Sequence, residues 1–321
     1  MNVLKQLTAG RIAWGLLFAC GVVPLLAQDA STADRNVVNS RFRPGDMMAD
    51  SPVVFPKEGA LPALYPPDTK TISRPAGDGY YLFTSPCRSV GQIRSIRGAM
   101  PEGSFSLAET DWMHLGRTRQ ILGDGGQLRI LALGDSIVND VMRSGWVGML
   151  AESNPGVGVE TWVYVRGGGG CQHYREEKRI EKYVVPLRPD LVLIGGISQR
   201  SVADIREVLR QLRDALPEVE VLLFTGAFGT ADPRDSQALA DASHSGTGRY
   251  GEALSALASQ ERCAYLDLTS PWAEYVKLSG QHPHVFYRDV VHANEYGEQI
   301  LGRILERFFK GGGAVPIEAR E

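Results

Sequence analysis

The stretch Leu131-Ala-Leu-Gly-Asp-Ser-Ile-Val-Asn-Asp140 joins an apolar run to an amphipathic segment through a tight Gly-Asp-Ser corner. The apolar run, residues 128–133, is short and unbroken, which is typical of a strand buried on both faces of a parallel sheet. Beyond the corner, apolar residues recur roughly at helical spacing as far as Leu150. We therefore expect Ser136 at the start of a helix, where backbone N–H groups are free and the helix dipole is positive.

Two interpretations of Ser136 are open at this point. It can be the N-cap of the helix, since Ser is among the residues preferred there, or it can be a nucleophile, which needs a base from elsewhere in the chain. The segment Asp289-Val-Val-His292 offers such a base, because the Asp can hold one ring nitrogen while the other nitrogen faces a serine. A solvated Asp beside a helix-capping His would have the same sequence.

Ser136 and the pair Asp289 and His292 stand at opposite ends of an alternating strand and helix pattern, and together they resemble the SGNH (GDSL) hydrolase superfamily. The resemblance runs from Leu128 to about Phe309. It implies that Ser136 is the nucleophile of a catalytic triad, that His292 is its base, and that Asp289 holds the imidazole. It also implies a reaction that uses no metal and no cofactor.

In this superfamily a glycine after the second strand gives its backbone N–H to the oxyanion hole, beside the N–H of the nucleophilic serine. The matching loop is glycine-rich, residues 165–171, and its alignment with the family places that glycine at Gly170. Gly168 or Gly169 would serve if the loop is offset. The resemblance therefore gives Ser136 and Gly170 as two oxyanion donors.

The third family block, Gly-x-Asn-Asp, is where this sequence departs from the superfamily. Its strand and glycine are present, but Ser198 stands at the position of the asparagine. Gln199 follows and has an amide that could replace it. Because one oxyanion donor is typically worth about 10²–10³ in rate, the departure bears on the strength of catalysis more than on its existence.

Apolar runs and amphipathic segments alternate through the rest of this region. The expected strands are 128–133, 159–165, 190–195, 219–225 and 263–268, and the expected helices are about 137–151, 172–184, 201–215, 247–260 and 294–309. Such alternation implies a parallel sheet covered by helices on both faces, with ligands at the carboxyl ends of the strands. Together with the resemblance, it predicts an α/β protein with a three-layer, flavodoxin-like SGNH fold and a five-stranded parallel sheet.

The N-terminus is typical of a secretory signal peptide, residues 1–27. Lys5 and Arg11 precede an apolar stretch, 12–26, that ends near Ala27. A membrane anchor is the alternative, but the stretch contains a proline and is short for a span. Leu17-Phe-Ala-Cys20 is loosely similar to a lipoprotein cleavage box. We expect export to the periplasm or the medium, with no stable membrane insertion after signal cleavage.

The domain boundaries follow changes in composition. Residues 28–78 are rich in proline and are expected to be a linker. Residues 79–127, with a strand expected at 80–83 and a helix at 90–100, are too few for a core of their own and are expected to pack on the catalytic domain. That domain is 128–310, and 311–321 form a C-terminal tail. A carbohydrate-binding role for the aromatic residues of 79–127 is an alternative.

Removal of the signal peptide leaves three cysteines, Cys87, Cys171 and Cys263. At most one disulfide can form within the chain, and the sequence does not select the pair. Cys171 directly follows the oxyanion loop and could be a second nucleophile. Packing or a disulfide is favoured, because no base motif accompanies it.

Composition and spacing argue against several other classes of protein. The net charge of −3 does not suggest nucleic-acid binding. The glycines 167–170 lack the spacing of a phosphate-binding or dinucleotide loop. His282, His284, Asp289 and His292 match no helical zinc signature, and the triad already uses two of them. An α/β-hydrolase elbow needs Gly-x-Ser-x-Gly, which the corner at Ser136 lacks.

These patterns predict an exported serine esterase, a carboxylic ester hydrolase that removes short acyl groups, mainly acetyl, from carbohydrate. Export suits a polymeric substrate, and no apolar lid-like helix suggests long acyl chains. Lipase or arylesterase activity on other small esters is the alternative within enzymes. A non-catalytic glycan-binding protein on an SGNH scaffold is the alternative from another class. The sequence favours no particular oligomeric state.

Overall fold

A six-stranded sheet, in the order β1-β4-β3-β5-β6-β7, forms the centre of the fold. The computed structural model describes residues 81–83, 88–166, 168–199, 201–227, 229, 231–238, 246–288 and 291–315. Five strands are mutually parallel: β3 (Gly126–Gly134), β4 (Val157–Val165), β5 (Leu191–Ile194), β6 (Glu220–Phe224) and β7 (Ala264–Leu266). The sixth strand, β1 (Tyr81–Phe83), pairs with β4 in the antiparallel direction and lies at the sheet edge.

The strand order explains how distant segments come together. The first parallel strand, β3, lies between β4 and β5, so the chain leaves β3 toward one edge of the sheet and then returns to the other side. This reversal is the topological switch point at which open α/β sheets bind ligands. Ser136, Gly170 and Ser198 follow β3, β4 and β5, so all three lie at the carboxyl ends of these neighbouring strands.

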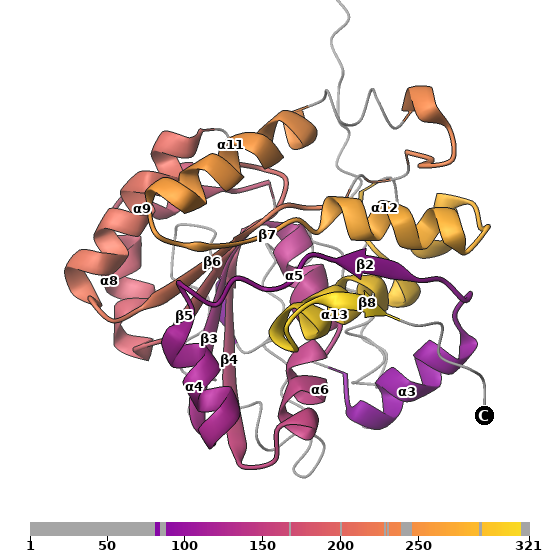
Figure 1. Cartoon of the computed structure of the whole chain (residues 1–321). Coiled ribbons are helices and arrows are strands. Elements are labelled where there is room, and N and C mark those ends of the chain that lie inside the picture. The colour runs from indigo at the N-terminus through magenta and orange to yellow at the C-terminus, as the bar shows by residue number, and fades with distance from the viewer. Residues whose placement is uncertain are drawn as a thin grey trace, which may run out of the picture.

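Helices cover both faces of the sheet (Figure 1). Each face has its own apolar core. One face carries α5 (Ser136–Arg143), α6 (Trp146–Ser153), α12 (Thr269–Leu278) and α13 (Glu295–Phe309). The opposite face carries α7 (Cys171–Tyr174), α8 (Arg179–Tyr183), α9 (Val202–Ala215) and α11 (Gly246–Gln260). The predicted three-layer α/β fold with five parallel strands is therefore confirmed.

The single helix expected at 137–151 is wrong, because the segment forms α5 and α6 with a break at Ser144 and Gly145. Gly145 has φ +77°, a backbone conformation that favours glycine. A Cβ atom at this position would lie 2.7 Å from the carbonyl oxygen of Arg88 and 2.8 Å from Ile93. The break thus lets residues 88–93 pack closely against the start of α6.

The single helix expected at 172–184 is also divided. Glu177 and Lys178 lie between α7 and α8 with φ of 54° and 56°, which a continuing right-handed helix does not allow. A short 3-10 helix, η4 (Val185–Leu187), then leads to β5. Residues 175–178 are all charged and include no glycine or proline, so the sequence did not indicate a break in the helix.

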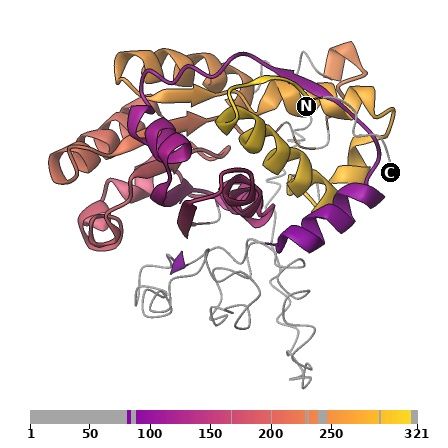
Figure 2. The ribbon, with the colours of Figure 1, turned by 60° about the horizontal axis from the view of Figure 1, so that its bottom comes forward.

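The N-terminal part of the described chain packs on α13. The helix expected at 90–100 is confirmed as α3 (Val90–Ala99), which begins with a capping box between Ser89 and Gln92. Arg97 of α3 forms an ion pair with Glu306 of α13, and the two side chains are only 10% and 8% exposed. Figure 2 shows α3 alongside α13.

Several elements were not expected from the sequence: α4 (Gly116–Asp124), η5 (Pro283–Phe286), and the antiparallel pair β2 (Phe105–Leu107) and β8 (Gly313–Val315), besides α12. Glu220 at the start of β6 accepts the backbone N–H groups of Arg117 and Thr118 and so caps α4 from a distance. The expected signal peptide and linker lie outside the described residues. Within the described part of the chain, no helix has the length and apolar character to cross a membrane.

Candidate active site

Ser136 and His292 meet at the carboxyl end of β3. The Nε2 atom of His292 lies 2.9 Å from the Oγ atom of Ser136, although the two residues are 156 positions apart. Ser136 is the first residue of α5 and is 8% exposed. The N-cap of α5 is Asp135, whose side chain accepts the N–H of Ile137, so the N-cap interpretation of Ser136 is wrong.

Asp135 ties the corner after β3 to the loop after β5. Its carboxylate accepts the backbone N–H groups of Ile197 and Ser198, both at 2.7 Å. The carboxyl group is buried, and burial raises its pKa while these hydrogen bonds oppose the rise. Gly196 makes the approach possible, because it has φ +99° and a Cβ atom there would lie 2.2 Å from the Asp135 Oδ1.

The segment around His292 is held on both sides. The backbone N–H of Arg288 donates to the carbonyl oxygen of His292 at 2.9 Å, and Tyr287 forms an isolated antiparallel bridge with Ala293. Asn294 then caps α13 by accepting two N–H groups of its first turn. Asp289, the predicted third member of the triad, lies outside the described residues.

The predicted oxyanion residues Gly170, Ser198 and Gln199 lie together. A Cβ atom on Gly170 would lie 2.7 Å from the Gln199 Oε1 and 2.8 Å from the Ser198 carbonyl oxygen, so the contact requires glycine. Gln199 accepts the N–H of Cys171 at 2.8 Å, and its Nε2 donates to the Gly195 carbonyl at 3.2 Å. The Gln199 amide thus connects the loop after β4 to the loop after β5.

Two donors of the altered third block are engaged inside the protein. The N–H of Ser198 donates to Asp135, and one hydrogen of the Gln199 amide donates to the Gly195 carbonyl. The N–H of Ser136 has no acceptor within its own helix, because Ser136 is the first helical residue. Sequence reasoning missed Asp135, although its place inside the Gly-Asp-Ser corner was a usable signal.

Cys171 and Cys263 are free, buried thiols. Burial raises the pKa of Cys171 far above its usual range and that of Cys263 to about 11. A thiol held protonated is a poor nucleophile, so the alternative of Cys171 as a second nucleophile is disfavoured. Cys87 lies outside the described residues.

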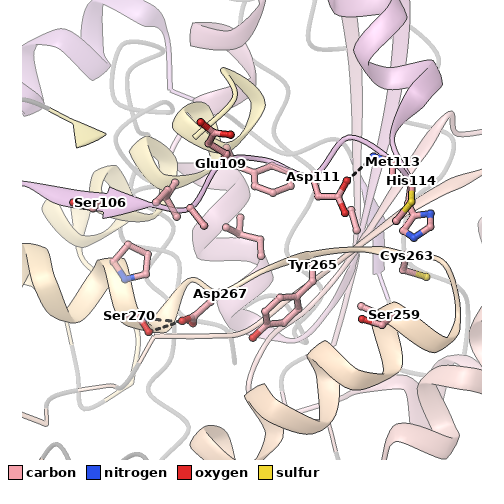
Figure 3. A pocket seen from close by; sticks show the side chains of 17 residues that line it. Ser106, Glu109, Asp111, Met113, His114, Ser259, Cys263, Tyr265, Asp267 and Ser270 are labelled. Atoms are coloured by element: carbon pink, nitrogen blue, oxygen red, sulfur yellow. Dashed lines mark hydrogen bonds between the residues drawn. The ribbon is translucent and has the colours of Figure 1, made fainter. Parts of the chain in front are cut away.

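The structure also forms a pocket of about 470 Å³ along the outer side of β7 (Figure 3). Glu109 and Asp111 lie on one wall and Tyr265 and Asp267 on the other. Asp267 is engaged inside the protein, where it accepts the hydroxyl of Ser270. No predicted site residue lines this pocket. Among the described residues, no group of three or more His, Cys, Asp or Glu side chains could hold a metal ion.

A serine hydroxyl beside an imidazole, at the carboxyl edge of a three-layer α/β fold, is the arrangement of a serine hydrolase. The sequence model of the GDSL-like Lipase/Acylhydrolase family matches residues 132–300, more than half of the chain. The chain therefore belongs to this family, whose class of reaction is the hydrolysis of carboxylic esters. The resemblance inferred from the sequence is confirmed.

Solved structures of esterases and lipases match parts of this chain at low sequence identity. A two-domain esterase active on acetylated mannans, co-crystallized with mannopentaose, matches 64% of this chain and 55% of its own, with 15% identity and a TM-score of 0.47. An alpha/beta hydrolase enzyme from the metagenome of Lake Arreo, Spain, matches 58% of this chain and 96% of its own, with 17% identity and a TM-score of 0.44. An extracellular lipase from Streptomyces rimosus matches 56% and 98%, with 14% identity and a TM-score of 0.37. No curated protein sequence matches the chain.

Proposed function

We propose that this protein is an exported serine esterase that removes short acyl groups, mainly acetyl, from carbohydrate. The observation that carries the proposal is the 2.9 Å contact between the Ser136 Oγ and the His292 Nε2. A nucleophile and its base must lie within hydrogen-bond distance of each other for the proton to move as the new bond forms. Family membership supports the same class of reaction.

In the proposed mechanism, the Ser136 Oγ attacks the ester carbonyl while His292 accepts the hydroxyl proton. Asp289 has the proposed role of holding the imidazole in the required tautomer. His292 then gives the proton to the leaving alcohol, which departs and leaves an acyl group on Ser136. Water, deprotonated by His292, attacks the carbonyl of this acyl-enzyme. The bond to the Ser136 Oγ then breaks, His292 returns the proton to that oxygen, and the carboxylic acid is released. The residues supply the nucleophile, the base and the acid, and no cofactor enters the scheme.

Charge on the carbonyl oxygen needs donors that are placed before the reaction. We assign this role first to the backbone N–H groups of Ser136 and Gly170. Ser198 and Gln199 support these donors by holding the loop after β5 against both of their segments. The Ser198 N–H donates to Asp135, beside Ser136, and the Gln199 oxygen accepts the N–H of Cys171, beside Gly170. The second hydrogen of the Gln199 amide is the proposed third donor.

Polar side chains around the glycine loop favour a sugar as the alcohol part of the substrate. Arg166 and His173 contact each other at 3.0 Å beside Gly169, and Gln172 and Gln199 flank Gly170. A sugar offers many hydroxyls to such groups, whereas a long acyl chain needs an apolar channel. Hydrolysis of lipid or aryl esters is the second candidate within the family.

The test is acetate release by the mature protein from acetylated mannan, beside hydrolysis of p-nitrophenyl esters of increasing acyl length. We expect acetate esters to be the best substrates. Ser136→Ala and His292→Ala should each lower kcat by about 10³-fold or more, because the nucleophile and its base act as a unit. Ser201→Ala, which removes an exposed helix-capping hydroxyl, is the matched control and should keep full activity.

Faster hydrolysis of long acyl chains would move the assignment to a lipase. If the wild type binds glycans but hydrolyses no ester, and Ser136→Ala binds equally well, the protein is a glycan-binding module and the esterase proposal is overturned.

A further inference from the structure

Asp140 connects the helix of the proposed nucleophile to the segment of the proposed base. It lies on α5, four residues after Ser136, and is fully buried. One carboxylate oxygen accepts the backbone N–H of Ala293 at 3.0 Å. The other accepts the guanidinium of Arg288 at 2.7 Å. Asp140 therefore contacts the chain directly after His292 and also a side chain shortly before it.

Arg288 completes this connection through its second terminal nitrogen. That nitrogen donates to the carbonyl oxygen of Ala293 and lies 3.4 Å from Glu298 on α13. The backbone N–H of Arg288 also donates to the His292 carbonyl. Asp140 and Arg288 thus contact Ala293, and Arg288 also contacts the backbone of His292 itself.

The charges that face Asp140 come from three elements. Arg143 follows it on α5, Arg288 precedes His292, and the buried Glu298 lies in the first turn of α13. Arg88, ahead of α3, pairs with Glu298 at 2.6 Å. Asp140, Arg143 and Glu298 are buried, and such burial of charge gives little net stability, because desolvation opposes the attraction between the groups. A cluster of this kind is better explained by the precise geometry that it imposes.

We propose that Asp140 is a positioning residue: through Ala293 and Arg288 it fixes the place of His292 beside Ser136. The inference rests on the proposed esterase function and adds a residue to it. Proton transfer from Ser136 requires the two side chains to stay within hydrogen-bond distance. A displacement of about 1 Å at a reacting group can cost about 10²-fold in rate. Loss of Asp140 should therefore act on catalysis more than on substrate binding.

The experiment compares Asp140→Ala, Asp140→Asn and Glu306→Gln with the wild type on p-nitrophenyl acetate. Asp140→Ala should lower kcat by about 10–100-fold with KM changed by less than about threefold. Asp140→Asn should recover part of the loss, because its amide oxygen can still accept the Ala293 N–H. Glu306→Gln removes another buried carboxylate of an ion pair, away from His292, and should keep kcat within about twofold.

A double-mutant cycle separates positioning from general destabilisation. In the His292→Ala background, Asp140→Ala should cause no further loss of kcat, because the group that it positions is gone. Equal losses in both backgrounds would overturn the proposal. So would an Asp140→Ala variant with kcat within about twofold of the wild type.

A second readout does not depend on activity. The ¹⁵N chemical shift of the His292 Nε2 reports its contact with the Ser136 hydroxyl and should change in Ser136→Ala. If Asp140 positions His292, Asp140→Ala should show the same change while Glu306→Gln keeps the wild-type shift. An unchanged His292 shift in Asp140→Ala would overturn the positioning role of Asp140, whether or not the protein is an active esterase. Absence of esterase activity in the wild type would refute the proposed function separately.

Discussion

Asp140 is completely buried, and each of its carboxylate oxygens accepts a hydrogen bond. Its burial and the charges around it together determine its pKa. Burial raises the pKa of Asp140 to about 7, with Glu298 adding to the rise and Arg288 and Arg143 opposing it. In the unfolded chain an aspartic acid titrates at about pH 3.9. Between these two values the folded protein holds a proton that the unfolded chain has lost. The stability that this group contributes is therefore complete below the lower value and is lost as the pH rises through the higher one.

Asp140→Asn removes this titration and leaves a side chain of the same size. The unfolding free energy of the wild type minus that of Asp140→Asn should be larger at about pH 5 than at about pH 8, because only the wild type has the Asp140 contribution that is lost over that interval. Urea denaturation at the two pH values measures the difference. An equal or larger difference at the higher pH would contradict the raised pKa.

Among single residues, the sequence identified those that stand in a known catalytic motif. Ser136 and His292 were selected by their motifs, and the structure brings them into contact. Asp140 follows Ser136 by four residues, yet a polar residue on an amphipathic helix is ordinarily expected to face solvent. Its burial depends on Arg288, which is 148 residues away, and no local pattern reports such a partner.

Among the elements, the break between α5 and α6 has the clearest physical cause. The apolar spacing continues through Ser144 and Gly145, and a single glycine within a helical pattern is only a weak signal of a break. The strands and the long helices α9 and α13 were predicted well, because buried strands and amphipathic helices have distinct periodicities. α4 was missed because its cap comes from Glu220, which is remote in the sequence.

Gly145→Ala tests the break directly. An alanine would be strained at φ +77° and its Cβ would meet the Arg88 carbonyl, so we expect a loss of about 1–3 kcal/mol in unfolding free energy. Gly91→Ala is the matched control. Gly91 lies inside α3 with nothing within 4 Å of an added Cβ, and the change should stabilise the protein by about 0.5–1 kcal/mol. Denaturant unfolding of both variants checks the pair, and a neutral Gly145→Ala would contradict the steric account.

For the whole molecule, the order of strands places the proposed site. The loops that follow β3, β4 and β5 meet at the carboxyl ends of these strands. His292, from near the C-terminal end of the chain, reaches the same place. α3 joins this arrangement because Arg97 pairs with Glu306, while Arg88, just before α3, pairs with Glu298. The alternation of strands and helices predicted the layers. The attachment of α3 to α13 could not be predicted, because it depends on pairs more than 200 residues apart.

The most direct measurement of the central claim is covalent labelling by a p-nitrophenyl alkylphosphonate, followed by peptide mass spectrometry. The Ser136 Oγ should attack phosphorus, p-nitrophenolate should leave, and His292 should accept the serine proton. We predict one adduct per chain, on the peptide that contains Ser136. The adduct should be absent from Ser136→Ala and should form about 10³-fold more slowly in His292→Ala. A folded wild type that forms no adduct, or an adduct that persists in Ser136→Ala, would contradict the assignment of Ser136 as the nucleophile.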